Sequence, residues 1–126
     1  MSDIIKLKFV ERVILDPDRL VELCVSLGDA GAEELISLTM EELSCGLGRV
    51  EEAYTAQNWS IMSAEARQLS NAADHIGMQT FVTVVADVVT CVEQQDFIAL
   101  SATLERLRRI ADKSLNAMWD MQDIPG

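Results

Sequence analysis

The feature that most constrains the fold is a regular spacing of apolar residues. Between positions 62 and 76 these residues follow one another at intervals of four, three, four and three: Met62, Ala66, Leu69, Ala73 and Ile76. All five lie on one side of an α-helix, because about 3.6 residues complete a helical turn. The spacing therefore predicts a helix with one buried face.

Three further stretches carry stripes of this kind. The stretch from about 30 to 56 has Ile36, Leu43, Leu47, Val50 and Tyr54. The stretch from about 78 to 94 has Phe81, Val85, Val88 and Val92, and the last has Phe97, Leu100, Leu104, Leu107, Ala111 and Met118. The valine-rich third stretch also suits a strand, but it is too long for an ordinary one. We predict four amphipathic helices, with a local bend allowed at Gly46 and Gly48.

Helix start and stop signals divide the stretches. Asp16 can cap a helix whose first residue is Pro17, and Gly28 supplies a left-handed stop, which predicts a short helix before the other four. Further along the chain, Asn58 or Ser60 can cap the helix that ends at Gly77, and Asp96 can cap the last helix. The chain is thus expected to be all-α: one domain over residues 1–126, with a core of about 15–118, forming an antiparallel up-down four-helix bundle with a short additional N-terminal helix.

Charge narrows the range of partners. Ten basic and twenty-one acidic residues give a net charge of -11, which repels nucleic acids and anionic membrane surfaces. No apolar run approaches the roughly 18 residues of a spanning helix, and the first residues lack the pattern of a secretory signal. We expect a cytoplasmic protein that binds neither nucleic acid nor membrane.

Cys24, Cys45 and Cys91 are far apart and form no C-x-x-C pair. This spacing argues against a disulfide framework or a zinc site, and we expect the three thiols on buried helix faces. We expect no metal and no cofactor. Trp59 and Trp119 stand at predicted helix ends, where they would close the bundle.

The third predicted helix contains Ala66-Arg67-Gln68-Leu69-Ser70-Asn71, followed by two alanines, Ile76 and Gly77. Upstream lies EELISLTMEELSCGLGRVEEAY, and downstream Val92-Glu93 precedes Asp96. From about Leu15 to Met118 this order resembles the histidine phosphotransfer (HPt) domain of bacterial two-component phosphorelays, whose third helix carries A-H-x-L-K-G and ends at a glycine.

The resemblance places Arg67 at the phosphoacceptor histidine, Ser70 at the lysine and Asn71 at the glycine. A guanidinium stays protonated and offers only hydrogen-bond donors, so Arg67 cannot accept a phosphoryl group from an aspartyl phosphate. The resemblance therefore implies a protein that is not an enzyme and that docks a response-regulator receiver domain or a histidine kinase. Arg67, Ser70, Asn71 and Asp74 would bind the partner, since they share an arc of about 100° opposite the apolar stripe. An ordinary solvated face is the alternative.

Two other functions remain open. His75 is the only histidine and could itself carry phosphate, although it lies eight positions beyond Arg67, about 12 Å along the helix. The chain could also be a helical scaffold or oligomerisation protein unrelated to phosphorelays. Arg106, Arg108 and Arg109 form one basic cluster, which can pair with Glu105 or Asp112 or meet an acidic partner.

Overall fold

The computed structural model describes residues 15–122, with side chains as far as residue 117. It contains four helical elements: α2 (Pro17–Thr55), α3 (Trp59–His75), α4 (Gln79–Glu93) and α5 (Phe97–Gln122). Apart from an isolated bridge between Leu15 and Met78, the described residues contain no β-structure. The all-α prediction is confirmed, including the helical assignment of the valine-rich stretch.

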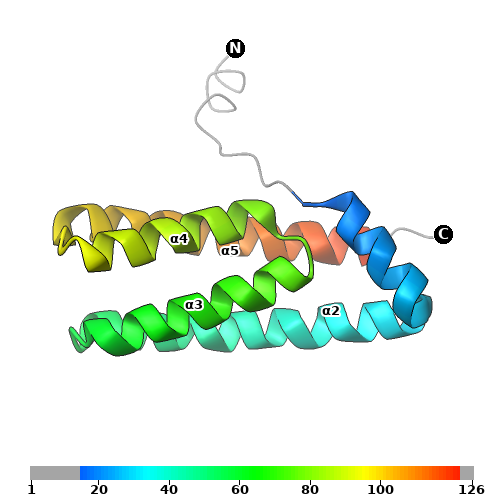
Figure 1. The fold of residues 1–126 in the computed structure, drawn as a ribbon, viewed down its shortest axis with the longest axis horizontal. Coiled ribbons are helices and arrows are strands. Elements are labelled where there is room, and N and C mark those ends of the chain that lie inside the picture. The colour runs from blue at the N-terminus through cyan, green and yellow to red at the C-terminus, as the bar shows by residue number, and fades with distance from the viewer. Residues whose placement is uncertain (1–14, 123–126) are drawn as a thin grey trace, which may run out of the picture.

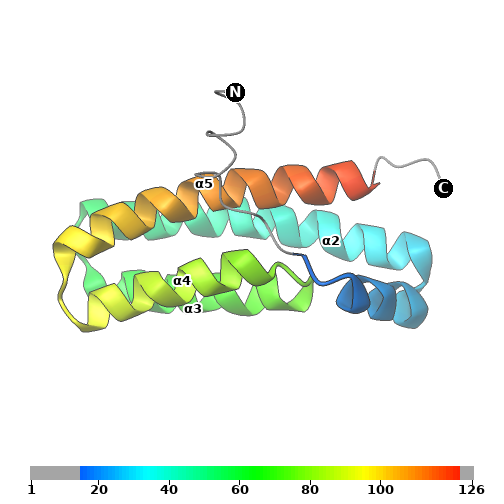
Figure 2. The same cartoon turned by 90° about the horizontal axis from the view of Figure 1, so that it is seen from above.

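The helices lie side by side in a bundle, and the chain reverses direction at each turn (Figures 1 and 2). α3 packs against α2 and α4, while α5 packs against α4 and α2. Within the described part of the chain, the backbones of α3 and α5 do not come close to each other, so the two helices stand diagonally across the bundle and meet only through side chains at one end. A change on the outer face of α3 is therefore remote from α5.

α2 bends sharply at Gly28. This residue has φ 75° and ψ 164°, outside the helical region, and residues 17–27 cross the end of the bundle before 29–55 runs along it (Figure 1). Asp16 caps the first part as predicted, since its carboxylate accepts from the backbone N–H groups of Asp18 and Arg19. Gly46 and Gly48, where a bend was allowed, have helical backbone.

The predicted stripes form most of the core. The five residues of the α3 stripe are each at most 3% exposed. In α4, the adjacent Val84 and Val85 are both fully buried, because this helix packs against α3 on one side and α5 on another. Met118 and Trp119 lie outside the residues whose side chains are described.

Two expectations about burial were wrong. Phe97 is 44% exposed, because it is the first residue of α5 and stands at the end of the core. Cys24 and Cys45 are exposed and Cys91 is half-buried. The inner faces of the two parts of α2 are occupied by other residues, Leu20 and Leu23 in the first and Leu43 and Val50 in the second, which leaves the thiols outside.

The three turns between helices share one hydrogen-bonding pattern. At the α3–α4 turn, Met78 N–H donates to the Ala73 carbonyl and Gly77 N–H donates to the Asp74 carbonyl, both over 3.1 Å. The α2–α3 and α4–α5 turns repeat these bonds. This is the Schellman motif, which requires a left-handed residue just beyond the helix. Glycine fills that position at Gly77, but Gln57 and Gln95 fill it in the other turns, with φ 56° and 55°.

Replacing Gln57 or Gln95 with glycine should therefore stabilise the fold by about 0.5–1 kcal/mol each, because a side chain is disfavoured at positive φ. Urea unfolding measures the effect. Gln68→Gly is the matched control: Gln68 is exposed in the interior of α3, so this variant should lose about 1 kcal/mol. Equal losses of stability in Gln57→Gly and Gln68→Gly would contradict the expected strain at the turns.

Candidate functional site

The four residues of the predicted face lie on the outer side of α3. Arg67, Asn71 and Asp74 are exposed and Ser70 is half-buried. They are carried by a helix that begins after Asn58, whose side-chain oxygen accepts from Ile61 N–H, and ends at His75. Because the opposite side of α3 holds the buried stripe, the helix presents these side chains away from the core.

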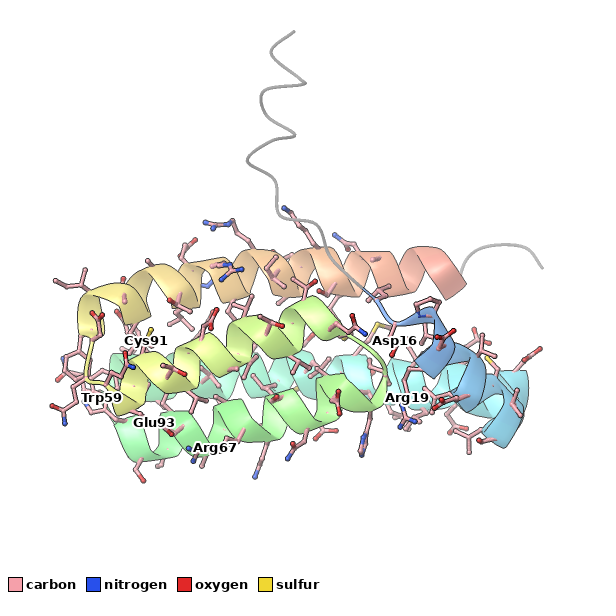
Figure 3. All side chains as sticks on the ribbon, turned by 45° about the horizontal axis from the view of Figure 1, so that its top comes forward. Asp16, Arg19, Trp59, Arg67, Cys91 and Glu93 are labelled. Carbon is pink, nitrogen blue, oxygen red and sulfur yellow. The ribbon has the colours of Figure 1, made fainter. Side chains whose placement is uncertain are left out.

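Arg67 forms an ion pair with the neighbouring helix. Its Nη2 lies 2.7 Å from Oε1 of Glu93, near the end of α4 (Figure 3). The side chains are 60% and 58% exposed, so the pair contributes at most about 1 kcal/mol to stability. The guanidinium thus lies at the α3–α4 edge of the face, already bound to a carboxylate. No spacing in the sequence indicated this contact, since the two residues are 26 positions apart.

Among the residues that the structure describes, arginine–carboxylate pairs like that of Arg67 join neighbouring helices. Each of the four helix contacts carries one: Arg49–Glu65 at 3.0 Å, Arg67–Glu93 at 2.7 Å, Arg106–Asp87 at 3.2 Å and Arg108–Glu51 at 2.6 Å. Hydrogen bonds to Glu65 and Glu51 raise the pKa values of Arg49 and Arg108 above the ordinary arginine value. Arg108 also pairs with Glu105 at 2.7 Å, one of the two partners expected for the basic cluster.

His75 occupies a different environment from Arg67. It is the last residue of α3, and it is exposed. Its backbone carbonyl accepts a hydrogen bond of 3.0 Å from Arg19 Nε, and Asp16 N–H donates to the adjacent turn at the Gly77 carbonyl over 2.8 Å (Figure 3). These contacts attach the start of α2 to the end of α3, so His75 belongs to this junction and is two turns from Arg67.

The opposite end of the bundle is closed by aromatic rings. Trp59 stacks on Phe97 with ring centroids 4.7 Å apart and an interplanar angle of 25°. Tyr54 meets Trp59 edge-on, with centroids 6.2 Å apart. The stacking joins the start of α3 to the start of α5, as expected for Trp59. No sequence spacing indicated that Phe97 would be its partner.

The α3 face presents polar groups of low reactivity. Arg67 offers hydrogen-bond donors and no lone pair. The hydroxyl of Ser70 and the amide of Asn71 are weak nucleophiles, and in the described structure neither side chain makes a hydrogen bond to a base. Among residues 15–117, no three histidine, cysteine or acidic side chains gather closely enough to hold a metal ion. None of the described helices is long and apolar enough to cross a membrane.

Comparisons of the chain with models of protein families, with curated proteins and with solved structures found no match.

Proposed function

We propose that this chain is a non-catalytic, HPt-like signalling protein of the cytoplasm, built as an antiparallel up-down four-helix bundle with a short N-terminal helix. It docks a response-regulator receiver domain or a histidine kinase through Arg67, Ser70, Asn71 and Asp74, without accepting phosphate. The motif around Ala66 and the order of the helix signals are the sequence basis of this proposal.

The observation that carries the proposal is the state of Arg67. Its guanidinium stands on the exposed face of α3, where the resemblance puts the phosphoacceptor, and it already binds the carboxylate of Glu93 at 2.7 Å. A receiver domain presents carboxylates in its acidic pocket. Because an exposed ion pair is weak, exchanging Glu93 for a partner carboxylate costs little, and the arginine fork can bind the new carboxylate through two hydrogen bonds.

Three single variants test the docking face against the host's receiver domains and histidine kinases. Arg67→Ala should weaken the complex by about 1–2 kcal/mol, or roughly 5- to 30-fold in Kd, because arginine is a frequent interface anchor. Arg108→Ala removes the interhelix pair with Glu51 and the pair with Glu105, both on the far side of the bundle, and should leave Kd unchanged. Glu93→Gln should not weaken binding, since it frees the guanidinium. Isothermal titration calorimetry measures all three.

Equal weakening by Arg67→Ala and Arg108→Ala would show that the α3 face is not the docking surface. If the unmodified protein binds no receiver domain and no kinase, the proposal fails and a scaffold function unrelated to phosphorelays becomes the better account. Circular dichroism of each variant checks that the helices are retained, which is expected because each substitution is on the surface.

A further inference from the structure

A hollow of about 470 Å³ opens at the aromatic end of the bundle. The α2–α3 and α4–α5 turns both lie at this end (Figure 1). Its volume falls within the range of small-molecule sites, about 300–1,000 Å³. Five residues line it: Tyr54, Thr55, Gln57, Trp59 and Phe97. Three of the five are aromatic and none is charged, which is unusual on the surface of a chain with a net charge of -11.

Three aromatic rings line the hollow and pack against one another. Trp59 stacks on Phe97, and Tyr54 stands edge-on to Trp59 at an interplanar angle of 63°, so the three form a continuous aromatic wall. Phe97 remains 44% exposed in this arrangement. The face of an aromatic ring carries partial negative charge and attracts cations within about 6 Å. The wall therefore favours a cationic ligand over an anionic one.

The surrounding backbone and side chains favour a cation as well. α2 and α4 both end here, and the carboxyl end of a helix carries partial negative charge. Neither helix has a basic residue in its last turn, and Glu52 of α2 lies there instead. Glu93 of α4 also lies there, but its charge is paired with Arg67. α3 and α5 begin at the same end, but the side-chain oxygens of Asn58 and Asp96 accept hydrogen bonds from their first turns and reduce the opposing positive field.

We propose that this hollow binds an organic cation: an alkylated ammonium or a guanidinium group. The aromatic wall contacts the apolar surface of the cation, and the side-chain oxygens of Thr55 and Gln57 are acceptors for any N–H group. Thr55 donates its hydroxyl proton to the Glu51 carbonyl over 3.0 Å, which leaves the lone pairs of Oγ1 available. The site is independent of the α3 docking face and does not rest on the proposed function.

A titration followed by ¹H–¹⁵N NMR tests the site. The probes are tetramethylammonium, methylguanidinium and the uncharged isostere tert-butanol, at constant ionic strength. We expect saturable shifts of the Trp59 indole and Gln57 amide resonances with a cation, at a Kd of about 1–30 mM. Tighter binding of tetramethylammonium indicates a free ammonium compound, and tighter binding of methylguanidinium indicates an arginine side chain of a partner. Equal shifts with tert-butanol, or no saturation below about 100 mM, would overturn the proposal.

Variants locate the binding. Trp59→Leu and Phe97→Leu should each weaken tetramethylammonium at least about fivefold, because each removes an aromatic face while keeping an apolar side chain. Ile98→Ala is the matched control, because Ile98 is 89% exposed beside Phe97 but does not line the hollow. This variant should bind tetramethylammonium with the same Kd as the unmodified protein. Unchanged binding in both leucine variants would place the cation elsewhere and refute the site. Circular dichroism confirms that each variant is folded.

Discussion

Gly77→Ala is expected to lower the free energy of unfolding by about 2–4 kcal/mol, the largest effect of any single methyl addition proposed for this chain. Gly77 has φ 76°, which disfavours a side chain. An added Cβ would also lie 3.1 Å from the Asp16 carbonyl oxygen and 3.3 Å from Arg19 Cβ. The first of these neighbours is backbone and cannot rotate away, so the α3–α4 turn and the start of α2 must shift slightly apart.

Gly28→Ala tests the other glycine with positive φ. Gly28 has φ 75° and ψ 164°, a combination that essentially only glycine adopts, although an added Cβ would meet no atom within 4 Å. This variant should lose about 1–3 kcal/mol through backbone strain alone. Urea unfolding measures both variants. Unchanged stability in Gly77→Ala would mean that neither the positive φ nor the approach of Asp16 disfavours a side chain at this turn.

Gly46→Val is expected to destabilise the fold by about 3 kcal/mol through overpacking. Gly46 lies where α2 crosses α3, and an added Cβ would stand 2.5 Å from Leu69 Cδ2. Leu69 is 3% exposed, so its side chain has little room to move. A valine adds two further carbons at the same place. The glycine at position 46 thus allows the close approach of the two helices.

Gly48, two residues further along α2, should respond in the opposite direction. No atom lies within 4 Å of an added Cβ there, so Gly48→Ala should raise stability by about 1 kcal/mol through helix propensity alone. Thermal unfolding of the two variants should show a loss of stability for Gly46→Val and a gain for Gly48→Ala. A stability gain in Gly46→Val, or a loss in Gly48→Ala, would contradict the packing described for α2 and α3.

Features encoded locally were predictable from the sequence. Asp16, Asn58 and Asp96 cap helices because each acts on backbone N–H groups two or three residues away, and Gly77 ends α3 because the required positive φ suits glycine. The α3 stripe was predictable for a similar reason, since the helical period alone places Met62 and its four companions on one face.

Features that depend on contacts between distant residues were not predictable. The exposure of Phe97 follows from where the core ends, and its partner Trp59 lies 38 positions earlier in the chain. Gln57 and Gln95 occupy positions for which glycine is the usual residue, so the sequence carried no sign of their positive φ. Cys24 is exposed because it lies on the outer side of its helix. Which side of that helix faces the core depends on how residues 17–27 cross the bundle.

The candidate site was predictable in its chemistry but not in its geometry. That Arg67 cannot take phosphate follows from the properties of a guanidinium, whatever surrounds it. The position of its side chain does not, because the ion pair with Glu93 depends on the register of α3 against α4. The contact between Arg19 and the His75 carbonyl spans 56 positions and depends in the same way on the packing of the start of α2.

The central claim is that the α3 face docks a partner and takes no phosphate from it. The most direct measurement incubates the protein with a receiver domain carrying radiolabelled phosphate, isolates the complex, and assays acid-labile phosphate on each chain. We expect the complex to form with all label remaining on the receiver, and His75→Ala to give the same result. Label transferred to the unmodified protein and lost in His75→Ala would contradict this account and establish a phosphotransferase that uses His75.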